Sequence, residues 1–173
     1  MMRPEFRKIL LDQRGAAVIL WSCFVISIPV YIVIARNVLG NPNIGSNRSV
    51  AEAARLVLWF LTVIDLGYYV YWRKRNLAAA AILRDARSTK LFRALEEFSG
   101  PVEEQAAYVV ATYVTRKVVI FAIIEAIAVY GLASAILGRF VSDLYFLSAI
   151  SLVLLVIEFP TEASLDQSLK ALG

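Results

Sequence analysis

The stretch that decides the fold runs from Val118 to Leu137 and reads VVIFAIIEAIAVYGLASAIL. It is apolar apart from one acid, Glu125, and it follows directly on Arg116 and Lys117. About 20 apolar residues in a helix cross the hydrocarbon core of a bilayer. A soluble core helix of that length would carry a polar face, which this stretch lacks. The stretch therefore predicts a membrane span with a carboxyl group inside it.

The composition agrees with a membrane protein. The 173 residues are 60% hydrophobic and 18% charged, whereas soluble domains are nearer half apolar and a quarter charged. The length favours one domain over residues 1–173. The formal charge is +4, but the basic residues flank apolar segments and form no single patch. The lipid bilayer is therefore the expected partner, and nucleic acid is not.

The chain has no histidine and a single cysteine, Cys23. Without histidine it cannot form a bis-histidine haem site, a histidine-ligated zinc or copper site, or a histidine-based catalytic triad. One cysteine cannot form an internal disulfide. We therefore expect no enzymatic activity, no cofactor and no bound metal.

Three more apolar stretches predict three more spans. Residues 16–35 follow a basic segment and are too long for the core of a signal peptide, so they form a retained first span. The second span, about 51–72, ends in a belt of tyrosine and tryptophan before three basic residues. The fourth covers about 141–159. With 118–137, these spans predict an all-α integral membrane protein with four transmembrane helices.

Three charged residues near the ends of these spans have expected roles. Glu52 and Arg55 stand one helical turn apart at the start of the second span, so we expect them to pair with each other. Glu158 stands near the end of the fourth span, from which its side chain can reach the membrane surface.

The connection 73–117 is polar and is expected to be helical. Four apolar residues recur in it at helical spacing, opposite charged ones, and predict an amphipathic helix that docks on the membrane surface or on a partner: Leu91, Phe92, Leu95 and Phe98. Pro101 then opens a new helix. No helix breaker occurs between Val102 and Leu137, so a third helix of 36 residues is expected to project into the cytoplasm.

The distribution of lysine and arginine predicts the orientation. The N-terminal segment, the connection 73–117 and the C-terminal tail together carry 14 of the 18 basic residues. The two loops on the opposite side and their flanks carry 4. Because basic residues concentrate on the cytoplasmic side, both termini are expected in the cytoplasm, in a bacterial inner membrane.

Two acids lie deep in the predicted spans. Asp65 precedes Arg73 by eight residues and Glu125 follows Lys117 by eight, which places both carboxyl groups about 12 Å inside the same edge. An ionised acid near the bilayer centre costs about 3 kcal/mol or more. Two interpretations stay open. The acids either bind a proton or cation together, or serve as neutral groups in hydrogen bonds between helices.

Small residues follow Glu125 at spacings of three, four and three, and form a smooth stripe on which another helix can pack closely: Ala128, Gly131, Ala135 and Gly138. The pattern fits packing within the chain and packing between chains equally well.

The segment Glu125–Leu132, EAIAVYGL, resembles the ion-binding outer helix of rotary ATPase proteolipids, where an acid precedes an apolar Tyr-Gly or Leu-Gly stretch. Four spans also match the larger, V-type members. The resemblance implies that Glu125 binds a proton or cation. It covers only about fifteen residues, and the glycine-dense inner helices of those rings have no counterpart. Residues 16–35 contain no glycine, and the second span contains only Gly67.

These features predict a non-enzymatic structural or accessory subunit of a larger membrane complex, or a homo-oligomer. The alternative is a proton- or cation-translocating subunit that uses Asp65 and Glu125. An embedded enzyme acting on lipids is the weakest hypothesis, because the chain shows no pairing of a nucleophile with a base.

Overall fold

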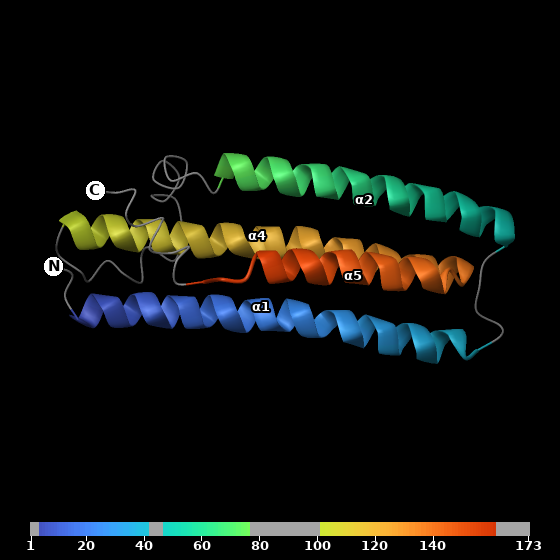
Figure 1. Ribbon diagram of the computed structural model, residues 1–173, viewed down its shortest axis with the longest axis horizontal. Coiled ribbons are helices and arrows are strands. Elements are labelled where there is room, and N and C mark those ends of the chain that lie inside the picture. Colours follow the sequence, from blue (N-terminus) through green and yellow to red (C-terminus); the bar gives the residue numbers. More distant parts are fainter. Residues whose placement is uncertain (1–3, 42–46, 77–100, 162–173) are drawn as a thin grey trace. The chain divides into compact units, whose positions relative to one another are not determined.

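The computed structural model describes residues 4–41, 47–76 and 101–161, and its regular elements in these ranges are all α-helices (Figure 1). The helices are α1 (Pro4–Leu39), α2 (Arg48–Asn76), α4 (Pro101–Gly138) and α5 (Val141–Ile157). The side chains of α1 and α4 are described from about Arg14 and Val110 onward. The all-helical prediction is confirmed for these ranges.

Two of the helices contain segments long and apolar enough to cross a membrane, Arg14–Leu39 in α1 and Thr112–Gly138 in α4. They contain the first and third predicted spans. The fourth predicted span corresponds to α5, an apolar helix of 17 residues. Helix α4 is continuous over 38 residues, against the 36 expected from the sequence. The predicted amphipathic helix with Leu91, Phe92, Leu95 and Phe98 lies outside the described residues.

The chain divides into two compact units. Unit 1 comprises Met1–Trp21, Tyr71–Ile120 and Phe159–Gly173, and unit 2 comprises Ser22–Val70 and Phe121–Glu158. Helices α1, α2 and α4 contribute residues to both units, whereas α5 belongs to unit 2 alone. Unit 2 contains both deep acids and the whole stripe of small residues.

In unit 1, aromatic and basic side chains make the described contacts. The rings of Trp21 and Phe159 meet edge to face, with centroids 4.8 Å apart. The guanidinium of Arg116 donates to the carbonyl oxygen of Asn76, the last residue of α2. These contacts join α1 to the segment after α5, and α4 to the end of α2.

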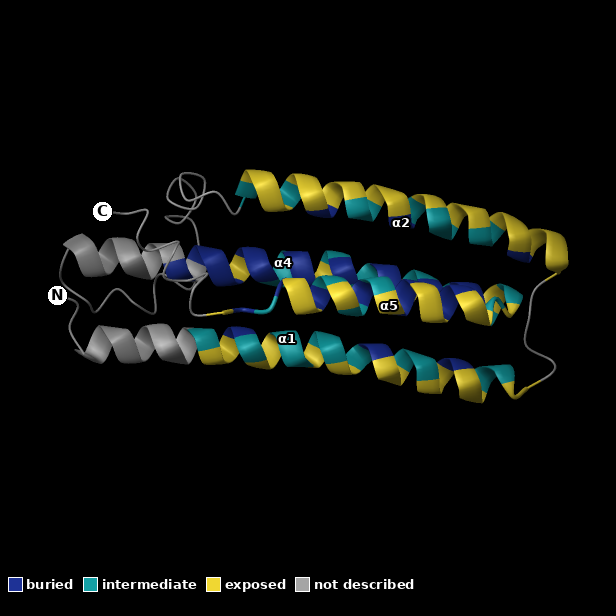
Figure 2. Ribbon diagram, in the orientation of Figure 1, coloured by how far each residue is buried: buried dark blue, intermediate teal, exposed yellow. Residues whose placement is uncertain are grey.

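Unit 2 is a bundle in which α4 is the most buried helix (Figure 2). Ile124, Ile127 and Ala128 of α4 have no solvent-exposed surface. One core cluster joins Ala35 of α1 and Ala135 of α4 to α5, and partly buried aliphatic side chains surround it: Leu144 in the cluster, and Ile32, Leu39 and Leu132 around it. Helix α4 is therefore the interior helix of unit 2, and α1, α2 and α5 contribute most of its outer surface.

The outer surface of unit 2 is strongly apolar. Helix α2 exposes a run of large hydrophobic side chains, and α1 and α5 do the same: Leu56, Val57, Phe60, Val63 and Ile64 on α2, Ile26, Val30 and Val33 on α1, and Phe146, Val153, Val156 and Ile157 on α5. Extended exposed apolar surface marks contact with lipid or with another protein.

Candidate functional site

Asp65 and Glu125, the two acids predicted from the sequence, each bind a tyrosine of a different helix. Tyr130 of α4 donates its hydroxyl to Oδ2 of Asp65 on α2 over 2.8 Å. Tyr31 of α1 donates to Oε1 of Glu125 on α4 over 2.6 Å. All four side chains are half-buried. Within the described residues, no hydrogen bond joins the two carboxyl groups to each other.

These two pairs make α4 the common partner of α1 and α2. It presents an acceptor, Glu125, to α1 and a donor, Tyr130, to α2. A phenol can donate to an ionised carboxylate or accept from a neutral carboxyl group, so both pairs stay satisfied in either protonation state. The arrangement suits hydrogen bonding between helices, because each acid has its own partner.

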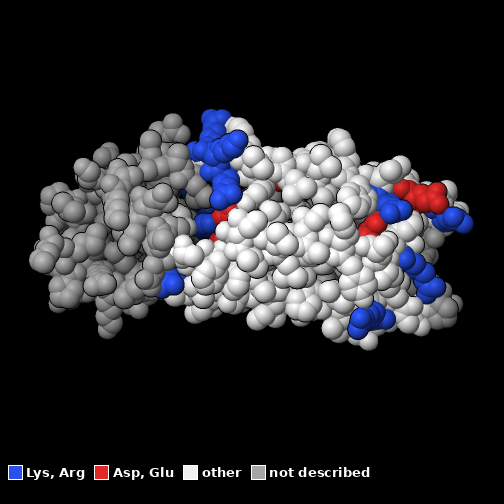
Figure 3. All heavy atoms as spheres, in the orientation of Figure 1, with Lys and Arg blue, Asp and Glu red and all other residues white. Residues whose placement is uncertain are grey.

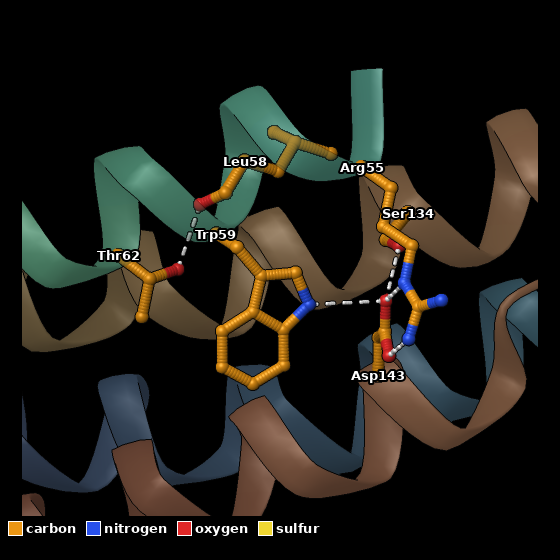
Figure 4. A network of polar contacts seen from close by, with 6 residues as sticks. All are labelled: Arg55, Leu58, Trp59, Thr62, Ser134 and Asp143. Carbon is orange, nitrogen blue, oxygen red and sulfur yellow. Dashed lines mark hydrogen bonds and ion pairs between the residues drawn. The ribbon is translucent and has the colours of Figure 1, made fainter. Parts of the chain in front are cut away.

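A third acid, Asp143, is the centre of a network of polar contacts in unit 2 (Figure 4). Arg55 of α2 binds it with two nitrogens, Nε to Oδ2 at 2.7 Å and Nη2 to Oδ1 at 2.8 Å. Trp59 Nε1 lies 3.2 Å from Oδ2, and Ser134 Oγ of α4 lies 3.0 Å from the same oxygen. The Asp143 side chain is only 4% exposed. Four donors thus satisfy a buried carboxylate, which is the condition for burying such a charge.

Aromatic rings surround this network. The Arg55 guanidinium lies over the Phe140 ring, 4.6 Å from its centroid, an arrangement in which the ring attracts the cation. The Trp59 and Phe146 rings lie 5.8 Å apart between centroids. Arg55 is 42% exposed, so one side of the guanidinium faces outward while the other holds Asp143.

The expected pair of Glu52 and Arg55 is wrong. Arg55 points to Asp143, and Glu52 instead pairs with Arg48 at 3.1 Å, one turn earlier on α2. Residues three or four apart on one helix are neighbours, so Glu52 could pair with Arg55 or with Arg48. The buried acid on α5 offers Arg55 a bidentate contact and a less hydrated environment, in which the attraction between charges is stronger.

Glu158 also differs from its expected role. It is 1% exposed and does not extend to the surface. Tyr69 of α2 donates its hydroxyl to Oε1 of Glu158 over 2.8 Å. Because α5 ends at Ile157, Glu158 stands at its C-cap, and its side chain bonds to α2.

The stripe of small residues packs inside unit 2. Ala128 and Ala135 are completely buried, and Gly131 is buried beneath α5. A Cβ atom on Gly131 would lie 3.1 Å from the Cα of Leu144, so the two backbones approach closely there. At Gly138 the ring of Phe140 occupies the place where a Cβ would stand. This stripe therefore contributes to the contact between α4 and α5.

The sequence analysis missed the Asp143 network, because Asp143 stands near the start of the fourth predicted span and no partner was expected for it. A usable signal existed. Arg55 near the start of the second predicted span and Asp143 near the start of the fourth have opposite charges, and both spans run in the same direction. When charges in different spans are compared by depth, Arg55 and Asp143 become a candidate pair beside Arg55 and Glu52, just as Asp65 and Glu125 were found at one depth.

Within the described ranges, no three His, Cys, Asp or Glu side chains come together as a possible metal site. No family model, no curated protein and no solved structure matches this chain significantly. The function therefore has to be inferred from the chemistry of the chain's own residues.

Proposed function

We propose that all four helices cross the bilayer of a bacterial inner membrane with both termini in the cytoplasm. We further propose that the chain is a non-enzymatic structural or accessory subunit of a larger membrane complex or a homo-oligomer. The observation that carries the proposal is the distribution of side chains in unit 2. Four of its acids bind side chains of other helices, and many of its large hydrophobic side chains point outward.

The inward polar groups support a membrane environment. Hydrocarbon offers polar groups no hydrogen bonds, so they have to be satisfied within the protein. Each of the four acids Asp65, Glu125, Asp143 and Glu158 accepts a hydrogen bond from a side chain of another helix. Hydrogen bonds of this kind hold membrane helices together.

The outward apolar groups support the subunit role. Leu56 and Phe60 on α2 and Val156 on α5 belong to faces that nothing in the described chain covers. Lipid tails or the helices of another membrane subunit, including a second copy of this chain, fit such faces. The small size of the bundle and the individual partners of its acids favour a structural role over transport.

Amide substitution separates this role from ion transport. Asp65→Asn and Glu125→Gln remove the titratable proton but keep an oxygen that accepts from Tyr130 and Tyr31. We expect the double variant to keep wild-type assembly on native gels of the solubilised membrane. Alanine at either position should lower the free energy of unfolding by about 1 kcal/mol, since the interhelical bond is lost.

The readout for transport is proton or sodium flux into proteoliposomes that contain the purified chain. We expect the wild type and the double amide variant to give the same flux as empty vesicles. A wild-type flux that disappears in the double amide variant while assembly is retained would establish the proton- or cation-translocating alternative.

A further inference from the structure

Two arginines of unit 2, Arg36 and Arg139, each make a contact near the C-terminal end of α1, and we refer to them as the arginine cluster. Arg36 of α1 donates through Nη2 to the hydroxyl of Tyr145 on α5, over 3.3 Å. Arg139, in the turn between α4 and α5, donates through Nη2 to the carbonyl oxygens of Leu39 and Asn41, over 3.1 Å each. Both arginines are exposed. Each guanidinium has five N–H donors, and these contacts occupy one nitrogen of each.

The other charges at this end of unit 2 are paired. Arg48 pairs with Glu52, and Arg55 pairs with Asp143. In the described part of the chain, no acid pairs with Arg36 or Arg139. Figure 3 shows basic groups at this end of the unit, beyond a largely uncharged surface. The two arginines therefore carry positive charges that no described acid compensates, and an anion would be attracted to them.

The backbone holds Arg139 in an unusual conformation. Its φ is 57°, in the left-handed region, and its N–H bonds to the carbonyl of Ala135 at the end of α4. Glycine is the usual residue at this position after a helix, because a Cβ atom is strained there. A strained backbone conformation of this kind persists only where surrounding contacts stabilise it. Here the side chain binds the carbonyls at the end of α1, so the guanidinium is held in place before any ligand arrives.

The cluster stands at a boundary between apolar and polar sequence. Arg36 directly follows the apolar stretch 16–35, and Arg139 follows 118–137 by one glycine. If these helices cross the bilayer, as the proposed function requires, both guanidinium groups lie at the level of the lipid phosphates. Tyr145 and Phe146 are exposed on the first turns of α5 and offer amphipathic and apolar contacts to the glycerol and acyl parts of a lipid.

We propose that Arg36 and Arg139, together with Tyr145, bind anionic phospholipid headgroups at the C-terminal end of α1. Guanidinium groups match the oxygens of a phosphate with parallel N–H donors. An anionic headgroup is favoured over a zwitterionic one because the cluster has two uncompensated positive charges. This site rests on the proposed membrane role and adds a class of lipid that unit 2 would bind.

The test compares phosphatidylglycerol and phosphatidylcholine binding to the purified full-length chain by native mass spectrometry. We expect the wild type to retain phosphatidylglycerol preferentially, and the double variant Arg36→Gln/Arg139→Gln to bind it at least about tenfold more weakly. Glutamine keeps an N–H for Tyr145 and for the α1 carbonyls. Arg48→Gln is the matched control, since it removes a charge of 92% exposure at the same end. We expect it to bind as the wild type does.

Three results would overturn the lipid site: equal binding of both lipids by the wild type, unchanged binding in the double variant, or an equal loss in Arg48→Gln. Inorganic phosphate should not displace the lipid at millimolar concentration, and displacement would indicate a free-phosphate site instead. Carbonate extraction of membranes tests the proposed function separately. Release of the wild-type chain contradicts the membrane role, whereas a retained chain without the lipid preference contradicts only the lipid site.

Discussion

Gly131 shows how one residue sets the distance between two helices. A Cβ atom there would lie 3.1 Å from the Cα of Leu144 and 3.3 Å from the carbonyl oxygen of Asp143. Both are backbone atoms of α5, which cannot rotate away as a side chain can. Gly67 on α2 is a contrasting case, because a Cβ atom would meet nothing within 4 Å.

We expect Gly131→Ala to lower the free energy of unfolding by about 1–3 kcal/mol, because the added methyl group pushes α4 and α5 apart. Gly67→Ala adds the same atom in open space, so it should leave stability unchanged or raise it slightly through better helix propensity. Denaturation of both variants in the same detergent, followed by circular dichroism, measures the difference. Equal effects of the two substitutions would show that α5 does not pack on Gly131 this closely.

Between Arg55 and Tyr69, helix α2 turns polar side chains toward its neighbours and large apolar side chains outward. Four residues of this face bind acids or donors on α4, on α5 or directly after α5, at spacings that keep them on one face: Arg55, Trp59, Asp65 and Tyr69. The opposite face exposes Leu56, Phe60 and other large hydrophobic side chains. This inversion is favourable in a membrane and unfavourable in water.

Two polar contacts hold α2 parallel to α5. Arg55 binds Asp143 near the start of each helix, and Tyr69 binds Glu158 near the end. The contacts are 14 residues apart on α2 and 15 apart on the α5 side, or about 21 and 22 Å along a helix. Because these spacings match, both contacts form together and set the register of the pair.

Leucine substitutions test the Arg55–Asp143 contact. We expect Arg55→Leu to destabilise the bundle more than Asp143→Leu does. Arg55→Leu leaves the buried Asp143 carboxylate with only Trp59 and Ser134 as donors. In Asp143→Leu, the unpaired Arg55 can instead turn to the surface. The double variant should lose less stability than the two single variants added together, since no charge remains unpaired. Equilibrium unfolding of the three variants in detergent gives this comparison, and simple additivity would rule out a direct pair.

At the scale of the whole molecule, the 14-to-4 division of basic residues predicts the orientation. A thiol reagent that cannot cross the membrane should label Ser46→Cys and Ser142→Cys from outside intact cells. It should not label Ser88→Cys or Ser168→Cys until the membrane is opened. Cys23 is first replaced by Ala so that it gives no background. Labelling of Ser88→Cys in intact cells would reverse the proposed topology.

The sequence by itself determined that the described segments form helices. Length, apolar runs, and Pro101 at the start of α4 are local signals, and a helix forms its backbone hydrogen bonds within one segment. Only the tertiary structure decided the partners of the polar groups. Tyr31, Tyr130 and Tyr69 resembled ordinary span or interface residues, and Asp143 stood near the end of a predicted span like other charged residues. The acid that each tyrosine binds depends on how helices distant in sequence rotate and pack against each other. The sequence of a single segment does not specify that rotation. The same reason explains why Arg55 pairs with Asp143, 88 residues away, and not with Glu52 on its own helix.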